Sequence, residues 1–230
     1  MRLLLVDLDN TLGDRTGAFA QWATEFVQTY GFDGEALRVV HEADRDGLAP
    51  RSAFFAEVCD RLGLSIDVET LVARYATEYT RHYRAFPGVP DALGGLRGEG
   101  WRIAVVTNGS WWQRDKIRIA GLTGVIDACC ISGEVGVRKP DPKILEVAAE
   151  MCGLPLEGAW MVGDSLVDIQ AAHAAGIRSA WIDHGRRWPE AAFAPTRIVE
   201  SFVDATAAIG GLNITTPNPA RADGALGPGH

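Results

Sequence analysis

The sequence has no long hydrophobic run and little positive charge. No stretch of its 230 residues approaches the roughly 20 consecutive apolar residues of a transmembrane helix. Asp7 also interrupts the first apolar run too early for a signal peptide. Lys and Arg total 22 against 30 Asp and Glu, which leaves a formal net charge of -8. We therefore expect a cytoplasmic protein whose partners include neither a membrane nor a nucleic acid.

Cysteine is scarce as well. The four cysteines are Cys59, Cys129, Cys130 and Cys152, and none belongs to a Cys-x-x-Cys pair. Cys129 and Cys130 are adjacent in an apolar run, and neighbouring positions of a strand point to opposite faces, so they are poor ligands for one metal ion. We expect free, buried thiols in a reducing compartment.

Short apolar runs and helical patterns alternate along most of the chain. With 47% hydrophobic and 23% charged residues, the composition is that of a soluble globular protein of one domain or two small ones. Strands are predicted at residues 3–6, 101–106, 126–131, 159–162 and 177–182, and helices at residues 89–98, 112–120, 142–152 and 166–175. This alternation predicts an α/β fold with a parallel sheet and right-handed crossovers.

The segment 14–85 interrupts that alternation. Its apolar residues recur at three- and four-residue steps with no strand pattern. Helices are predicted at residues 18–30, 35–44, 52–62 and 68–83. Asp67 is placed to cap the last of them. From Asn213 onwards the chain is rich in Pro and Gly, and we expect a disordered tail with no catalytic role.

Two carboxylates, Asp7 and Asp9, follow the first predicted strand. Alternation along an extended chain sends both side chains to the same side. The carboxyl ends of strands are where open α/β sheets bind ligands. Because two such acids repel each other, a bound cation or a proton held on one of them would relieve the repulsion. The alternative is a turn in which Asp and Asn side chains satisfy the local backbone.

Three further polar motifs lie beyond the first pair of acids. They are Thr107-Asn108-Gly109, Lys139-Pro140, and Gly163-Asp164-Ser165 with Asp168 following. Taken singly, they are typical of a turn, a solvated lysine and a helix N-cap. Because the carboxyl ends of parallel strands meet at one edge of a sheet, their side chains could instead converge on one site.

Together, and in this order, the four motifs resemble those of the haloacid dehalogenase superfamily. The resemblance spans roughly residues 1–205. It implies a Rossmann-like parallel sheet core flanked by helices, with an inserted all-helical cap. The expected division is a catalytic core at 1–13 and 86–211, a cap at 14–85, and a tail at 212–230. The chain looks most like members that act on nucleotide or sugar phosphates, such as the N-acylneuraminate-9-phosphatase and pyrimidine 5′-nucleotidase groups.

The resemblance also assigns chemical roles. Asp7 would be the nucleophile that forms an aspartyl-phosphate, and Asp9 would act first as general acid and then as general base. Thr107, the backbone amide of Asn108 and Lys139 would hold the phosphate group. The expected activity is hydrolysis of a small phosphorylated metabolite, and the sequence makes no prediction of the oligomeric state.

Magnesium is the cofactor that the resemblance implies. Its ligands would be the Asp7 side chain, the Asp9 backbone carbonyl and the Asp164 side chain, while Asp168 would support this shell or orient Lys139. Carboxylate and carbonyl oxygens are the ligands that such a hard cation prefers.

Two other functions compete with a phosphatase. A phosphomutase of the β-phosphoglucomutase type also keeps both aspartates, but that group usually reads Asp-Gly-Val where this chain has Asp9, Asn10 and Thr11. A non-catalytic phosphate-binding or regulatory protein on the same fold would be expected to have lost one of the motif residues. Dehalogenating members lack a carboxylate at the position of Asp9.

Four large side chains near these motifs have two readings each. Trp111 and Trp112 could stack on a substrate, but packing is the commoner role for tryptophan and is the one we expect. Arg15 and Arg51 could reach an anionic substrate, but we expect them to be solvated surface residues.

Overall fold

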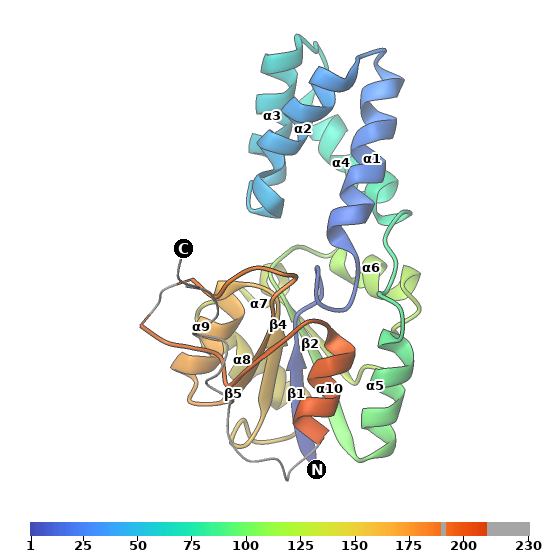
Figure 1. Cartoon of the computed structure of the whole chain (residues 1–230). Coiled ribbons are helices and arrows are strands. Elements are labelled where there is room, and N and C mark those ends of the chain that lie inside the picture. The colour runs from blue at the N-terminus through green and yellow to red at the C-terminus, as the bar shows by residue number, and fades with distance from the viewer. Residues whose placement is uncertain (190–191, 211–230) are drawn as a thin grey trace, which may run out of the picture.

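The computed structural model describes residues 1–189 and 192–210 (Figure 1). It is built on a six-stranded sheet with the order β3-β2-β1-β4-β5-β6. The strands are β1 (Arg2–Val6), β2 (Trp101–Thr107), β3 (Ala128–Ile131), β4 (Trp160–Gly163), β5 (Arg178–Ile182) and β6 (Arg197–Val199). Every neighbouring pair is parallel, which confirms the predicted α/β fold. The sequence reading missed β6, because its three residues are only partly buried and lack an apolar run.

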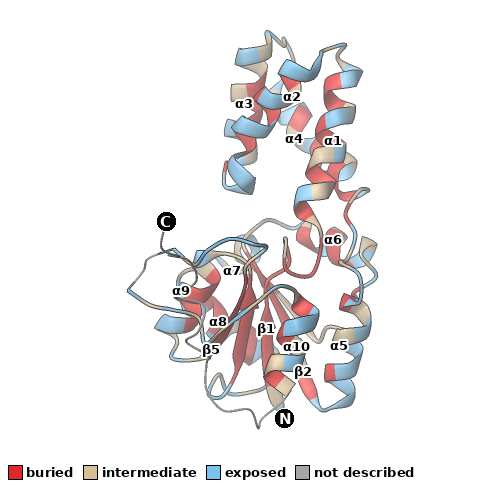
Figure 2. Ribbon diagram, viewed as in Figure 1, coloured by how far each residue is buried: buried red, intermediate tan, exposed pale blue. Residues whose placement is uncertain are grey.

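Helices cover both faces of the sheet. The helices of this part of the chain are α5 (Val89–Gly98), α6 (Gln113–Ile119), α7 (Ser132–Val135), α8 (Lys143–Met151), α9 (Leu166–Ala174) and α10 (Phe202–Gly210). Leu4 and Val6 of β1 belong to the apolar cluster that includes α5 and α10, whereas Leu3 and Leu5 belong to the one that includes α8 and α9. This alternation buries the central strands on both faces, as Figure 2 shows.

Between β1 and α5 the chain is helical. It forms α1 (Arg15–Thr29), α2 (Gly34–Asp44), the short 3₁₀ helix η1 (Arg45–Gly47), α3 (Arg51–Leu62) and α4 (Val68–Thr80). The main helices stand beyond the carboxyl end of the sheet (Figure 1). Aromatic rings pack between them, with Trp22 and Tyr75 edge to face at 4.7 Å.

The ends of α4 follow from local contacts. Asp67 caps the helix as predicted, because its side chain accepts a hydrogen bond from the Thr70 backbone at 2.8 Å. The helix stops at Thr80, three residues before the predicted end. Beyond Thr80 the backbone hydrogen bonds join residues three positions apart and not four, with Tyr83 N donating to Thr80 O. The Tyr83 hydroxyl donates to Leu8 O at 3.1 Å and so holds this residue against the loop after β1.

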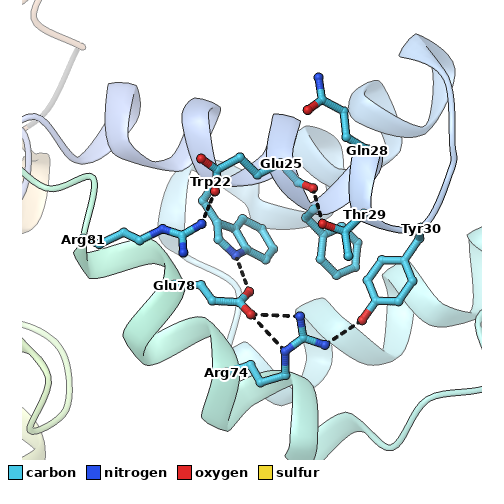
Figure 3. A pocket seen from close by; sticks show the side chains of 9 residues that line it. Trp22, Glu25, Gln28, Thr29, Tyr30, Arg74, Glu78 and Arg81 are labelled. Atoms are coloured by element: carbon cyan, nitrogen blue, oxygen red, sulfur yellow. Dashed lines mark hydrogen bonds and ion pairs between the residues drawn. The ribbon is translucent and has the colours of Figure 1, made fainter.

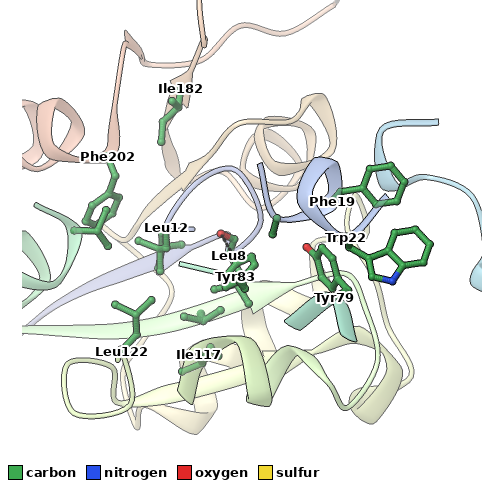
Figure 4. Close-up of a cluster of buried hydrophobic side chains, with 14 of the residues drawn as sticks. Leu8, Leu12, Phe19, Trp22, Tyr79, Tyr83, Ile117, Leu122, Ile182 and Phe202 are labelled. Atoms are coloured by element: carbon green, nitrogen blue, oxygen red, sulfur yellow. Dashed lines mark hydrogen bonds between the residues drawn. The ribbon is translucent and has the colours of Figure 1, made fainter. Parts of the chain in front are cut away.

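One apolar cluster joins the helices α1–α4 to the sheet. Figure 4 shows Tyr79 and Tyr83 beside Leu8 and Leu12, with Phe19 and Trp22 continuing the cluster toward the helices. Ile117, Leu122 and Phe202 extend it over one face of the sheet. The helical segment and the sheet therefore share buried surface.

Three remaining expectations concern exposure and the termini. All four cysteines are free, as predicted, but only Cys130 is buried and the other three are half-buried. None of the helices in the described ranges combines the length and hydrophobicity of a membrane span. The tail predicted at residues 212–230 lies outside the described residues.

Candidate active site

Adjacent strand ends bring the first candidate residues together. Because β1 lies between β2 and β4, the residues that end or follow these strands, Asp7, Thr107 and Asp164, meet at the carboxyl edge of the sheet. Asp7 N donates to Val162 O at 2.9 Å, which extends the β1–β4 pairing by one residue. The Asp7 backbone is thereby held by the sheet.

Lys139 reaches this edge from the loop between α7 and α8. Its Nζ lies 2.5 Å from Asp7 Oδ1 and 2.7 Å from Asp168 Oδ1, and it donates to Val106 O at 2.6 Å. The side chain is only 2% exposed. Since Nζ donates to two acceptors and also forms an ion pair with Asp168, Lys139 is a fixed buried charge and not a solvated lysine.

Asn108 holds the backbone that carries Lys139. Its Nδ2 donates to Lys139 O, and its Oδ1 accepts from Lys139 N, both at 2.9 Å. The Asn108 side chain thus ties the end of β2 to the lysine loop, a role that is invisible in the sequence because the two residues are 31 positions apart.

Three carboxylates gather beside Lys139. Asp7, Asp164 and Asp168 each offer an oxygen, and these atoms lie within 4.8 Å of one another. Asp168 belongs to a capping box at the start of α9, where its Oδ2 accepts from Ser165 N at 3.1 Å and from Ser165 Oγ at 2.6 Å. A Cβ at position 163 would lie 2.3 Å from Asp168 Oδ2, so this close approach requires Gly163.

The charges of this cluster are not balanced. Burial raises the pKa of Asp7; the nearby Lys139 opposes the shift, while Asp168 and Asp164 add to it. Burial, with Asp168 next in importance, raises the pKa of Asp164 to about 7. The three carboxylates face the ammonium group of Lys139 and the half-exposed guanidinium of Arg186, whose Nη2 lies 3.4 Å from Asp164 Oδ2. One negative charge is still left over, so a further cation would stabilise the cluster, and an all-oxygen donor set suits a hard divalent ion. The residues present therefore fit Mg²⁺.

The Asp9 carboxylate has a separate set of partners. Lys116 Nζ donates to its two oxygens at 2.9 and 2.8 Å, and Gln113 Nε2 donates to Oδ2 at 3.1 Å. Gln113 Nε2 also donates to Thr107 Oγ1 at 2.6 Å. Burial would raise the pKa of Asp9, but the charge and hydrogen bonds of Lys116 outweigh it and the pKa is lowered.

Asp7 and Asp9 lie two positions apart but have different partners. Strand β1 ends at Val6, and Asn10 already has a positive φ of 58°. Asp9 forms an isolated bridge with Gly13 just before that residue, and the two carboxylates are held by different lysines.

Lys116 is the site residue that the sequence reading missed. It is 4% exposed, and its Nζ lies over the rings of Tyr79 at 5.0 Å and Tyr83 at 5.2 Å. Burial lowers the pKa of Lys116, against the opposing charge of Asp9. Gln113 and Lys116 are three residues apart on α6 and so share one helix face. A glutamine and a lysine three residues apart, on the helix that follows the Thr107 motif, were the sequence signal that could have identified Lys116.

The expectation of packing is wrong for Trp111, and the expectation of solvation is wrong for Arg15 and Arg51. Trp111 is 60% exposed, so it does not pack in the interior, while its neighbour Trp112 is half-buried and meets it edge to face. Arg15 and Arg51 are not solvated. Arg15 Nη2 lies 2.6 Å and Arg51 Nη1 2.9 Å from the same oxygen, Oδ1 of Asp44.

A cavity of about 550 Å³ lies away from these residues, between α1 and α4 (Figure 3). Its charged groups pair with one another: Arg74 lies 2.8 Å from Glu78, and Arg81 pairs with Glu25. None of the candidate catalytic residues lines it. The cavity therefore adds nothing to the site at the sheet edge.

Phosphatases and a nucleotidase are among the known sequences similar to this chain. The model of the haloacid dehalogenase-like hydrolases matches residues 4–182. A phosphoserine phosphatase of Thermus thermophilus is 31% identical, over 81% of this chain and 90% of that protein. A phosphoglycolate phosphatase of Cupriavidus necator is 28% identical, over 86% and 89%. A pyrimidine 5′-nucleotidase of Escherichia coli is 39% identical, over 50% and 52%.

Solved structures share the architecture. A hydrolase of this superfamily from Bacillus subtilis, bound to magnesium, has a TM-score of 0.77 at 20% identity and covers 90% of this chain and 98% of its own. A Thermotoga maritima structure described as a β-phosphoglucomutase also has a TM-score of 0.77, at 19% identity, covering 93% and 100%. At these identities the likeness establishes the fold alone. The family match, which spans well over half of the chain, shows that the protein belongs to the haloacid dehalogenase-like hydrolases.

Proposed function

We propose that this protein is a Mg²⁺-dependent phosphatase that hydrolyses phosphate monoesters of small metabolites through an aspartyl-phosphate on Asp7. The observation that carries the proposal is the separation of two carboxylates, Asp7 and Asp9, onto different lysines. Two carboxylates in different environments can take different roles, one as nucleophile and one as acid and base. Phosphatases and a nucleotidase among the similar proteins support this reaction class.

In the first half-reaction an Asp7 oxygen attacks phosphorus and the bond from phosphorus to the ester oxygen breaks. Asp9 gives a proton to the leaving oxygen, because an alkoxide is a poor leaving group. Because Lys116 lowers the pKa of Asp9 in the free protein, Asp9 must take up this proton when the negatively charged phosphate group binds beside it. Lys139, the Thr107 hydroxyl and the Asn108 backbone amide would offset the charge of the phosphoryl group. The buried ammonium of Lys139 already touches Asp7 and is therefore pre-positioned.

In the second half-reaction Asp9 takes a proton from water, and the water oxygen attacks phosphorus. The bond between phosphorus and Asp7 then breaks, which releases phosphate and restores the carboxylate. Lys116 positions Asp9 for both steps, since it holds both carboxylate oxygens.

Mg²⁺ would be held by the Asp7 side chain, the Asp9 backbone carbonyl and the Asp164 side chain. Asp168 would support this shell, because its oxygens are committed to Ser165 and Lys139. When bound, the ion would neutralise negative charge on the nucleophile and the phosphoryl group. Exhaustive chelation should stop hydrolysis and added Mg²⁺ should restore it; activity that survives chelation would contradict these roles.

We further propose that residues 14–85 form a cap over a core made of residues 1–13 and 86–211. Tyr79 and Tyr83, which cover Lys116, come from the cap side of the site. A cap that touches the partner of Asp9 is well placed to select the leaving group.

The direct test is a panel of phosphomonoesters assayed with Mg²⁺ and ranked by kcat/KM. The panel should contain sugar phosphates, nucleoside monophosphates, phosphoserine and phosphoglycolate, because the similar proteins are named for different substrates. Conversion of a sugar phosphate to its isomer without phosphate release would instead identify a mutase. No turnover of any member would overturn the proposal.

A further inference from the structure

The cap contains a buried cluster with an excess of positive charge. Arg15 and Arg51 share Asp44 Oδ1, and Asp44 Oδ2 accepts from Gly47 N at 2.9 Å. The side chains of Arg15, Arg51 and Asp44 are 10%, 12% and 3% exposed. Two guanidinium groups therefore face one carboxylate in a nearly dry environment, which leaves one positive charge without a partner in this cluster.

The cluster borders the catalytic carboxylate. Arg51 lies over the ring of Tyr75 at 5.4 Å, and Tyr75 stacks on Tyr79 with centroids 4.9 Å apart. Tyr79 in turn covers Lys116, the partner of Asp9. The pKa of Asp9 is lowered against the effect of burial, chiefly by Lys116, and the charge of Arg15 contributes in the same direction as Lys116. The cluster thus lies on the side where Asp9 would meet a leaving group.

Some hydrogen-bond donors between the Arg15–Arg51–Asp44 cluster and Asp9 have no acceptor. Tyr79 is 1% exposed, and its hydroxyl has no hydrogen-bond partner among the described residues. Arg15 donates through Nη2 alone within residues 1–189 and 192–210. Buried polar groups are normally satisfied, so the Tyr79 hydroxyl and the remaining Arg15 nitrogens are donors that a ligand atom would satisfy.

We propose that Arg15, Arg51 and Tyr79 form a subsite for a carboxylate on the leaving group, which makes phosphorylated hydroxy acids the preferred substrate class. This inference rests on the phosphatase function proposed above. Across the border, Arg15, Arg51 and Lys116 face Asp44 and Asp9, a surplus of one positive charge. One surplus charge matches a carboxylate monoanion, and a guanidinium fork matches its two oxygens.

The competing explanation is a salt-bridge network that only holds the cap together. The cavity of Figure 3 provides an internal comparison, because there Arg74 and Arg81 pair with Glu78 and Glu25 and no charge is left over. If the network at Arg15 were purely structural, substituting Arg15 would lower the stability of the protein and would change KM for all substrates alike. A subsite would affect only substrates that carry the anion.

The test compares two esters that differ only in the anion, 2-phosphoglycolate and 2-hydroxyethyl phosphate. Tyr79→Phe keeps the stacked ring and removes the hydroxyl, and Arg15→Lys keeps the charge and removes the fork. We expect KM for phosphoglycolate to rise roughly three- to tenfold in Tyr79→Phe and about tenfold or more in Arg15→Lys. KM for hydroxyethyl phosphate should change less than about twofold. Tyr30→Phe and Arg74→Gln, in the outer cavity, are matched controls that should change neither value.

Binding gives a second readout that needs no turnover. Calorimetry with Mg²⁺ should show that wild-type protein binds 3-phosphonopropionate more tightly than propylphosphonate, and that Arg15→Lys removes the difference. Equal binding of the two phosphonates, or equal KM changes for both esters, would overturn the subsite. Preference for fructose 1,6-bisphosphate over phosphoglycolate would overturn the carboxylate assignment. If no ester is hydrolysed but the Arg15-dependent difference in binding persists, the phosphatase proposal fails and the subsite stands.

Discussion

Proton transfer in this site would depend on the Asp9 carboxylate and on its two hydrogen-bond partners, Lys116 and Gln113. Lys116 is buried under the rings of Tyr79 and Tyr83, so cations from the solvent cannot readily take its place beside Asp9. A carboxylate held at both oxygens has a fixed orientation, which general acid–base catalysis requires. Three substitutions at the residue scale test this part of the mechanism.

Replacing Asp7 by Asn should reduce turnover to background, because the amide is not a nucleophile and, being neutral, binds the cation more weakly. The side chain keeps its size, so cooperative unfolding should remain. Rapid-quench measurement of phosphate release is the check. A burst of phosphate from Asp7→Asn would exclude a covalent intermediate on this residue.

Asp9→Asn should slow both half-reactions, and its effect should depend on the leaving group. An alkyl phosphate needs a proton on its leaving oxygen, whereas p-nitrophenyl phosphate needs little. The phosphorylation step should therefore lose much more rate with the alkyl ester. Equal losses for both esters in single-turnover experiments would argue against Asp9 as the acid.

Lys116→Met should lower kcat for an alkyl ester by about ten- to a hundredfold, the range expected for losing hydrogen bonds between charged groups. KM should change little, because the lysine acts through Asp9. The loss should be smaller with p-nitrophenyl phosphate, and Lys116→Arg should restore part of it. Lys143→Met, at an exposed lysine of α8, is the control. An unchanged kcat in Lys116→Met would remove the lysine from the mechanism.

At the scale of elements, strand ends and helix starts hold the candidate catalytic residues. Asp7 and Thr107 are placed by β1 and β2, whereas Asp168 is placed by the first turn of α9. The contact between β4 and α9 is so close that only Gly163 fits between the strand and Asp168. The position of this carboxylate thus depends on the packing of one helix against one strand.

Gly163→Ala should therefore displace the start of α9. The added Cβ would lie 2.3 Å from Asp168 Oδ2, which forces a shift. We expect a loss of about 1–3 kcal/mol in the free energy of unfolding, typical of overpacking, and weaker Mg²⁺ binding. Gly94→Ala in α5 is the control: no atom lies within 4 Å of its Cβ, and a gain of about 0.5–1 kcal/mol is expected in a helix. Urea unfolding and Mg²⁺ titration measure both. Unchanged stability and affinity in Gly163→Ala would show that α9 has freedom to move.

At the scale of the whole molecule, the helices α1–α4 and the sheet share one apolar cluster (Figure 4). Leu8 and Leu12, in the loop after β1, pack with Tyr79 and Tyr83. Gly13 lies in the same contact, because a Cβ there would lie 2.5 Å from the Tyr83 ring. The junction between the two parts is thus a packed contact.

Replacing residues 14–85 by a short Gly-Ser linker should destabilise the core, because it exposes the apolar surface that Tyr79 and Tyr83 cover. In a folded variant, KM should rise and discrimination between phosphomonoesters should disappear, while some Mg²⁺-dependent hydrolysis of small esters persists. Cooperative unfolding and unchanged Mg²⁺ affinity must be established first. A folded capless core that ranks the panel as the full chain does would place specificity in core loops, such as that of Trp111 and Trp112.

The sequence by itself determined the α/β fold, the helices between β1 and α5 and the positions of the motif residues. These features depend on local signals: an apolar run, a helical period, and polar residues just after strands. Asp7, Thr107 and Asp164 could be placed together because parallel strands end at one edge. The helix cap at Asp67 follows from neighbours three residues away.

Only the tertiary structure decided which charges meet. Lys116 lies 107 residues from Asp9, and Arg15 lies 29 residues from Asp44. Whether an arginine is solvated or buried, and whether Trp111 packs or is exposed, depends on what the fold brings next to it. A local pattern describes the direction and polarity of a side chain along its own element. The partner of that side chain is chosen by how distant elements pack, because burial and Coulomb interactions depend on distances in space and not along the chain.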